Sequence, residues 1–447
     1  MSVALPPYSP GDCYMTSRVG ALGSPSSEDY ITGSTSRSPA PSYAALPRTR
    51  CGESTVEYTP RAGLQETPLG NLTKQWRDVT IIFKNQDDSL DTPTYGRNSS
   101  ICGEIGLENS ETVKTICLKL EGRINLSSSD CGSLVQKIVD ERRTLFDCAK
   151  SGRCPSVVGF ALVFPTTYED NEKIYRTPPS YEIVCHGSPL IVVKCTYRLS
   201  ITITKANRGR LSFRKTTSKT YPIHVAFRPR TRPARPILQD AFLSTLKVAP
   251  SEWHQMVVTI PQRRKATVAV EPVSCHLIIP SVQTFCLSEP IPFHIQLCGS
   301  QESLQHFYGS VPEPVLPGKR PRRRQYAARI RVFLARQIYL EINGRQSWRT
   351  ITVGEGTLRP IPPLESAHPD ADAAEVSVDW EGEVRCKSDV TCGSFSISRL
   401  VVKDFMIFAL TPGNVRTSSL LPIQHAHPIR LVTDGWTDQE LAHPQDR

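Results

Sequence analysis

The chain has 447 residues, of which 39% are hydrophobic and 21% charged, with 37 prolines and a formal net charge of +10. Its longest uninterrupted apolar run, Phe405 to Leu410, falls far short of the roughly 18 residues that a membrane-spanning helix needs. Short apolar stretches separated by prolines favour many strands joined by turns over a helical protein, and they predict a soluble chain.

Residues 1–52 are rich in Ser, Pro, Thr and Gly and poor in aliphatic side chains. Such a segment buries too little apolar surface to offset the entropy lost on ordering, so we expect a disordered tail. Three of its serines precede a proline, a context that suits proline-directed kinases. These candidate phosphorylation sites are Ser9, Ser24 and Ser38.

Residues 53–230 alternate apolar and polar side chains with a period of two, which is typical of strands with one buried face. Two runs, TICLKLEGRI and YRLSITITK, carry the clearest pattern, and they predict an antiparallel β-sandwich. The expected inward residues are Ile116, Leu118, Leu120, Tyr197, Leu199, Ile201 and Ile203.

One segment in this block, SLVQKIVDERRTLF at residues 133–146, has a different spacing. Leu134, Ile138 and Leu145 fall on one face of a helix. We therefore expect a short crossover helix that lies on a sheet.

Basic residues gather between Lys205 and Arg235, where ten lysines and arginines occur without an acidic residue. They predict a surface for acidic cargo segments or anionic lipid, and a solvated strand edge is the alternative. The residues assigned to this surface are Lys205, Arg208, Arg210, Arg214 and Lys215. We expect no nucleic acid as a partner.

Residues 231–249 form the expected linker, because alternating Pro and Arg in RPRTRPARPI favour a stiff extended chain over a strand. A second alternating block covers residues 250–437, and residues 438–447 are a short tail. In SEPIPFHIQL the expected inward residues are Ile291, Phe293, Ile295 and Leu297. The fold class is therefore all-β, with two tandem antiparallel β-sandwich domains.

No motif for catalysis or a cofactor stands out along the chain. The 14 cysteines are scattered without a CxxC pair, which indicates reduced, mostly buried thiols. His425 and His427 share one face of an expected strand, but they have no carboxylate or thiol nearby to complete a metal site. We expect no enzyme, no cofactor and no metal; a hydrolase or a secreted adhesin on the same sandwiches is an alternative.

Several segments resemble fungal arrestin-domain (α-arrestin-like) proteins, in the same order along the chain. GEIGLENSETVKTICLKLEGR, FALVFP, RTPPSYE and VKCTYRLSITI resemble strands of the arrestin N-terminal domain. PVSCHLIIPSVQTFCLSEPIPFHIQL, SWRTITVGEGTLRPIPP, VDWEGEVRC and HPIRLV resemble the C-terminal domain. The resemblance covers about residues 55–437 and implies two immunoglobulin-like sandwiches joined by a hinge.

The resemblance also implies a cytoplasmic adaptor, recruited to the plasma membrane and endosomes. Such an adaptor links the cytosolic tails of membrane transporters or receptors to a HECT-type ubiquitin ligase for ubiquitination and endocytosis. A retromer-like scaffold without ligase recruitment is the alternative function.

Ligase recruitment in this family uses PPxY motifs, which WW domains bind as polyproline helices. The strict copy, PPSY at residues 178–181, falls where the family begins a strand, so we expect it to be structural. The candidate WW-binding residues are Leu5, Pro6 and Tyr8 of LPPY, with Pro41 and Tyr43 of APSY as a weaker copy.

Overall fold

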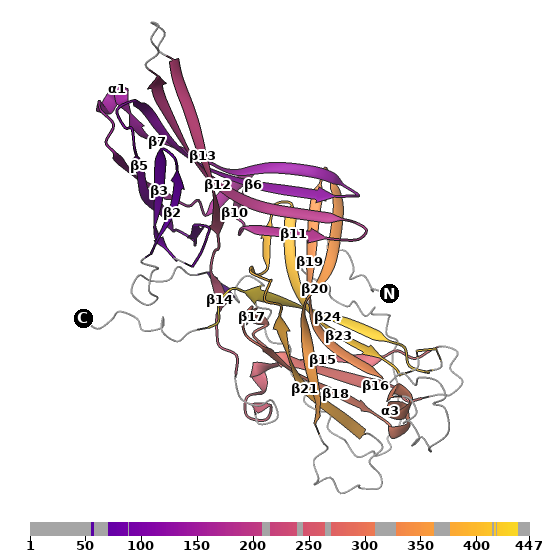
Figure 1. The fold of residues 1–447 in the computed structure, drawn as a ribbon. Coiled ribbons are helices and arrows are strands. Elements are labelled where there is room, and N and C mark those ends of the chain that lie inside the picture. Colours follow the sequence, from indigo (N-terminus) through magenta and orange to yellow (C-terminus); the bar gives the residue numbers. More distant parts are fainter. Residues whose placement is uncertain are drawn as a thin grey trace, which may run out of the picture.

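The computed structural model describes residues 55–57, 70–87, 89–207, 215–238, 245–263, 270–308, 328–361, 376–413, 415–416 and 418–436. Strands dominate these residues, which confirms the all-β class (Figure 1). The helical elements described alongside them are short: α1 (Cys148–Ser151), α3 (Gln301–Tyr308) and the 3₁₀ turn η1 (Pro250–Glu252). None of the helices in the described residues is long and apolar enough to cross a membrane.

Two sheets, antiparallel except for the parallel pair β4–β13, enclose a first hydrophobic core. One has the order β2-β3-β5-β8, with β2 (Gly70–Trp76), β3 (Val79–Gln86), β5 (Ser100–Leu107) and β8 (Val157–Val163). The other has the order β4-β13-β12-β6-β7, and β11 also pairs with β12. Its strands are β4 (Thr94–Tyr95), β6 (Val113–Ser128), β7 (Gly132–Asp147), β11 (Tyr181–Cys185), β12 (Ile191–Asn207) and β13 (Lys215–Phe227). All seven inward residues expected on β6 and β12 are buried in this core.

A ten-stranded sheet curls around a second core. Its order is β15-β16-β18-β21-β20-β19-β23-β24-β17, and β22 also pairs with β23. The strands are β15 (Trp253–Ile260), β16 (Val273–Pro280), β17 (Thr284–Cys286), β18 (Ile291–Gly299), β19 (Arg329–Ile342), β20 (Arg345–Ile361), β21 (Val376–Cys386), β22 (Phe395–Ile397), β23 (Leu400–Thr411) and β24 (Ile423–Val432). Met256 of β15 and Leu431 of β24 share this core, as do the four inward residues expected on β18.

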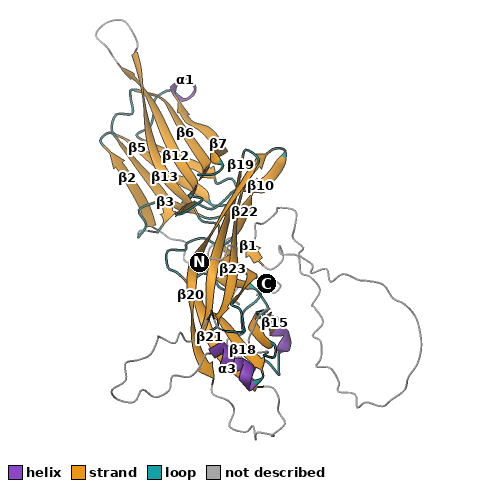
Figure 2. Cartoon of the chain, turned by 90° about the vertical axis from the view of Figure 1, so that its right-hand side faces the viewer, coloured by secondary structure: helices purple, strands orange, loops and turns teal. Residues whose placement is uncertain are grey.

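Two strands run from one core to the other. On β19, Leu334 belongs to the second core, whereas Leu340 and Ile342 belong to the first. On β23, Leu400 belongs to the first core and Met406 to the second. Figures 1 and 2 show β19 reaching from the ten-stranded sheet to the strands of the first core. The division into tandem domains with the expected boundaries therefore stays a prediction.

The tip of the β19–β20 hairpin is held against the strands of the first core by hydrogen bonds. Asn343 and Gly344 both have positive φ (53° and 73°), as a two-residue type I′ turn requires. Beyond the turn, the Ser347 hydroxyl lies 2.8 Å from that of Ser128 on β6, and both residues are buried. The Arg349 guanidinium then donates to the backbone oxygens of residues 186 and 188 at 2.9 and 2.8 Å.

The helix expected over residues 133–146 is wrong, because this segment is the edge strand β7, paired with β6 along its length. The register shifts at two points, and Ile138 and Leu145 are the extra residues of β7 there. A bulge interrupts the alternation of a strand. These two bulged residues produced the apparent helical spacing.

The linker was expected to lack strands, and this expectation is wrong in part. β14 (Thr231–Pro233) pairs antiparallel with β1 (Thr55–Glu57). Pro233 ends this pairing opposite Thr55. A proline is tolerated in a strand only where its missing N–H is not needed, as at the edge of a sheet. The remaining two-stranded sheet joins β9 (Thr167–Asp170) and β10 (Lys173–Arg176).

Candidate functional site

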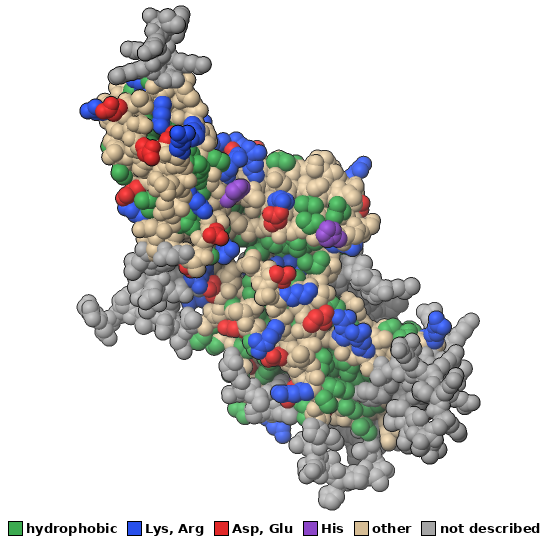
Figure 3. Space-filling model, viewed as in Figure 1, with side chains coloured by type: hydrophobic (Ala, Val, Ile, Leu, Met, Phe, Trp, Pro, Cys, Tyr) green, Lys and Arg blue, Asp and Glu red, His purple; other side chains and the backbone are tan. Residues whose placement is uncertain are grey.

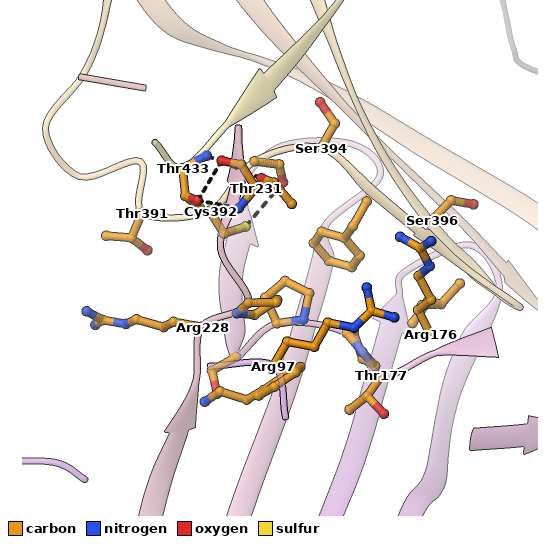
Figure 4. Close-up of a pocket in the computed structure, with 18 of the residues that line it drawn as sticks. Arg97, Arg176, Thr177, Arg228, Thr231, Thr391, Cys392, Ser394, Ser396 and Thr433 are labelled. Atoms are coloured by element: carbon orange, nitrogen blue, oxygen red, sulfur yellow. Dashed lines mark hydrogen bonds between the residues drawn. The ribbon is translucent and has the colours of Figure 1, made fainter. Parts of the chain in front are cut away.

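A cavity of about 250 Å³ lies where the ends of strands from both cores meet (Figure 4). We call it the junction pocket. Its lining residues are Arg97, Thr166, Arg176–Ser180, Phe227, Arg228, Pro229, Thr231, Thr391–Ile397, Arg430 and Thr433. They come from the β4–β5 and β8–β9 connections, from the end of β10 to β11, from the end of β13 to the start of β14, from the segment up to β22 with β22 itself, and from the end of β24.

The junction pocket is basic. Four arginines, Arg97, Arg176, Arg228 and Arg430, are among its described lining residues, and no aspartate or glutamate is. On the face drawn in Figure 3, by contrast, basic and acidic side chains are interspersed. Guanidinium groups present forked donors that match carboxylate and phosphate oxygens, so the pocket suits an anionic ligand.

The lining chemistry favours binding over catalysis. The described lining residues include no histidine and no carboxylate that would act as a general base. Burial raises the pKa of the Cys392 thiol to about 11, despite the opposing effect of Arg336. A thiol that stays protonated at neutral pH is a poor nucleophile.

Backbone hydrogen bonds hold the wall that carries Arg176 and Arg228. Ser180 N donates to Phe227 O at 2.8 Å, and Phe227 N donates to the Ser180 hydroxyl at 2.9 Å. Arg228 N donates to Tyr95 O at 2.8 Å. The two connections are thereby fixed to each other and to β4. In the view of Figure 4, Arg176 extends toward Ser396, whereas Arg228 extends to the left, away from the cluster of other side chains and below Thr391.

A buried ion pair holds the opposite wall. The Arg336 guanidinium donates to Asp404 Oδ1 at 2.7 Å and Oδ2 at 3.0 Å, and also to Cys392 O at 2.9 Å. The Ser394 hydroxyl donates to Asp404 Oδ2 at 2.6 Å. Burial opposes the charge of Arg336, but Asp404 outweighs it and raises the guanidinium pKa. Residues 391–397 are thus attached to a fixed charge pair.

A third contact joins β14 to the chain after β24. Asp434 N donates to Thr231 O at 3.0 Å, and Thr231 N donates to the Thr433 hydroxyl at 2.9 Å. Arg230 Nε lies 3.1 and 3.2 Å from the two carboxylate oxygens of Asp434. The pocket therefore has three walls that other parts of the fold position independently.

The basic surface expected from the sequence is only partly described. Lys205 Nζ lies 3.0 Å from Asp78 Oδ2, and Lys219 Nζ lies 2.9 Å from Oδ1. Hydrogen bonds from Lys219, Lys205 and the Tyr221 hydroxyl hold the pKa of Asp78 well below its usual range, against the effect of burial. Lys205 thus has an acidic partner within the fold.

The structure does not describe the side chains of the other residues that were assigned to this basic surface. Arg208, Arg210 and Arg214 lie outside the described residues, and Lys215 is described only through its backbone pairing with Asn207.

The tail motifs also lie outside the described residues. This holds for Leu5, Pro6, Tyr8, Pro41 and Tyr43, and for Ser9, Ser24 and Ser38. PPSY is described, and its expected structural role is confirmed. Tyr181 begins β11, and the buried Pro178 accepts a 2.5 Å hydrogen bond from the Tyr197 hydroxyl. A segment held in this way does not fit a WW groove.

One of the two histidines on β24, His427, packs against a third histidine. The ring centroids of His427 and His254 are 4.9 Å apart, although β15 and β24 lie far apart in the strand order. His427 is buried, and burial together with His254 and His425 lowers its pKa to about 3. In the described part of the chain, no group of three or more His, Cys, Asp or Glu side chains could hold a metal ion.

Neither a family model nor a curated protein matches the chain in the comparisons with known proteins. The assignment of the junction pocket as a functional site therefore depends on its geometry alone. Sequence reasoning placed Arg228 in the basic run but missed Arg97, Arg176 and Arg430 as partners. Arg176 and Arg430 stand in RTPPSYE and HPIRLV, the quoted arrestin-like segments, and that was the available signal.

Proposed function

We propose that the protein is an arrestin-like adaptor that holds acidic cytosolic segments of membrane transporters or receptors in its junction pocket. Residues 1–52 would bring a HECT-type ubiquitin ligase to this cargo for ubiquitination and endocytosis. Two hydrophobic cores of β-strands and the ordered series of arrestin-like segments support the family assignment. The observation that carries the cargo chemistry is the set of four arginines without an acidic lining residue.

The dimensions of the pocket suit an extended segment of a partner protein. A volume of about 250 Å³ accommodates one or two side chains, while flanking residues of the ligand stay outside. Arg176 and Arg228 are exposed, so they can meet an approaching chain before it enters. Attraction of this kind weakens with salt, because the screening length is about 8 Å at physiological ionic strength.

Reversing the charge of the two exposed arginines tests this half of the function. For Arg176→Glu/Arg228→Glu we expect at least about tenfold weaker binding of a fluorescent 12-residue peptide of Asp, Glu and phosphoserine, because two like charges then face the ligand. Fluorescence anisotropy at two salt concentrations measures the affinity.

Arg142→Glu/Arg329→Glu is the matched control, since both residues are exposed and lie outside the pocket lining. The control carries the same change in net charge and is expected to bind nearly as tightly as wild type. Equal losses in both variants would mean that the peptide senses net charge alone, and the pocket assignment would be wrong.

The retromer-like scaffold remains the second candidate function. PPSY is held within the fold, so only residues 1–52 are left to recruit a ligase.

A peptide of residues 1–52 is expected to bind ligase WW domains, and Tyr8→Ala should weaken this binding more than Tyr43→Ala. Both sites together raise avidity on tandem WW domains. Absence of binding at hundreds of micromolar would favour the scaffold.

A further inference from the structure

One of the two sheets around the first core ends in an open edge at β8. This strand is the last in the order β2-β3-β5-β8, and no other strand of the described chain pairs with its far side. Its pairing with β5 runs from Val157 to Val163 without a register shift. The segment VVGFALV therefore presents a regular row of backbone groups to its surroundings.

A hydrogen bond at the end of this pairing shows which backbone groups face outward. Phe164 N donates to Ser99 O at 3.0 Å, directly beyond the pair of Val163 with Ser100. Successive residues of a strand direct their N–H and C=O groups to opposite sides, so the even-numbered residues of β8 point to β5. The residues whose backbone groups point away from the sheet are Val157, Gly159, Ala161 and Val163.

The strand β8 lacks the features that normally protect an edge. Edge strands avoid pairing with other chains through charged side chains, prolines or bulges. The edge strand β7 has charged side chains and bulges, whereas VVGFALV has no charge, no proline and no register shift. Val157 is 52% exposed and Val163 is 56% exposed, and Gly159 and Ala161 are exposed between them.

One outward group of β8 already has a partner. The Arg143 guanidinium on β7 donates to Ala161 O at 3.2 Å, which confirms that this carbonyl points away from β5. A carbonyl oxygen has two lone pairs and can accept a second hydrogen bond. The contact therefore leaves the edge able to pair with another strand.

We propose that β8 is a homodimer interface, at which the β8 strands of two copies of this chain pair antiparallel about a two-fold axis at Phe160. In such a symmetric contact, residues equally distant from the axis face each other. Val157 then faces Val163 of the second copy, and Gly159 faces Ala161 of the second copy. Each of these facing pairs exchanges two backbone hydrogen bonds.

The second copy is the partner that fits, because β8 is complementary to itself in this register. The exposed valines cover each other at both ends, and the small Gly159 and Ala161 lie together at the centre. A shift by two residues in either direction would set a valine against Ala161 or Gly159 and leave one end unpaired. The pairing brings no charge of β8 itself into the contact.

A dimer of this kind carries two junction pockets and two copies of residues 1–52. Two linked binding sites raise the avidity for cargo that is clustered in a membrane. This consequence rests on the proposed function, whereas the dimer itself does not. The probe-binding experiment on the junction pocket and the association experiment on β8 can therefore fail independently.

Sedimentation velocity of the full chain, in a concentration series up to hundreds of micromolar, tests for the dimer. We expect reversible association with a micromolar Kd, because a single pair of strands buries less surface than a standard interface. In Val157→Lys/Val163→Lys, like charges face each other at both ends, and the Kd should rise at least about tenfold. Both valines are exposed, so the fold should be retained, and thermal unfolding verifies this.

Two further variants make the result specific. Val157→Lys/Val163→Glu sets opposite charges against each other in the proposed register, and it should dimerise at least about tenfold more tightly than Val157→Lys/Val163→Lys. Val248→Lys/Val257→Lys is the matched control, since it adds the same net charge at two exposed valines outside β8. Its Kd should equal that of wild type.

Amide hydrogen exchange locates the contact. The amides of residues 157, 159, 161 and 163 should exchange more slowly in concentrated than in dilute wild-type protein, and Val157→Lys/Val163→Lys should lose this difference. A chain that stays monomeric at hundreds of micromolar overturns the proposal, as does a dimer that Val157→Lys/Val163→Lys leaves unchanged. If Val157→Lys/Val163→Glu fails to restore association, the proposed antiparallel pairing of β8 is wrong.

Discussion

Replacing Asp404 with alanine is expected to lower the free energy of unfolding by about 3–5 kcal/mol, because the buried Arg336 guanidinium then lacks its counter-charge. Arg336 is 2% exposed and Asp404 is 1% exposed, so water cannot replace the lost partner. Denaturant unfolding followed by tryptophan fluorescence measures the change. Since Arg336 and Asp404 also hold residues 391–397, we expect weaker binding of the acidic probe as well.

Two variants make this result specific. Glu355→Ala breaks the exposed pair with Arg331 and should cost no more than about 1 kcal/mol. Arg336→Met/Asp404→Leu replaces the buried pair with apolar groups and should recover most of the lost stability. Were Asp404→Ala no more destabilised than Glu355→Ala, the pair would not support the pocket wall as described.

Acidification is expected to destabilise the fold through His427, by about 3 kcal/mol at pH 4 relative to pH 7. Its pKa is about 3 in the fold and 6.5 in the unfolded chain. Between these values the unfolded state binds the proton and the folded state does not, so stability falls as the pH falls below 6.5. His427→Gln removes this contribution, and its stability should change less with pH than that of wild type.

Unfolding free energies at several pH values between 4 and 7 test the difference between the two proteins. His224→Gln is the control, because it makes the same substitution at an exposed histidine on another strand. Its pH profile should follow wild type. Parallel profiles for wild type and His427→Gln would contradict the assignment of a buried, neutral His427.

Strand faces could be predicted from the sequence, because alternation reports burial directly wherever pairing is regular. Leu118 and Ile295 are buried as expected on this basis. β7 could not be predicted, since the bulges at Ile138 and Leu145 depend on its pairing with β6. Local spacing carries no information about where a partner strand shifts register.

The junction pocket could not be predicted for a related reason. Its arginines are far apart in the sequence, from Arg97 to Arg430, and only the strand topology brings them together. The sequence instead drew attention to basic residues that are adjacent in the chain, and Lys205 among them is paired with Asp78. Arg228 is the one residue that belongs both to the basic run from Lys205 to Arg235 and to the described arginines of the pocket lining.

Photo-crosslinking of the acidic probe tests the central claim most directly, because it locates the bound peptide on the chain. A probe with a benzophenone group at its centre should attach to residues 176–180, 228–231 or 391–397, and acidic competitor peptide should suppress the reaction. Crosslinks confined to the β12–β13 hairpin around Lys205 and Lys219, with the pocket segments unmodified, would contradict the assignment of the junction pocket as the cargo site.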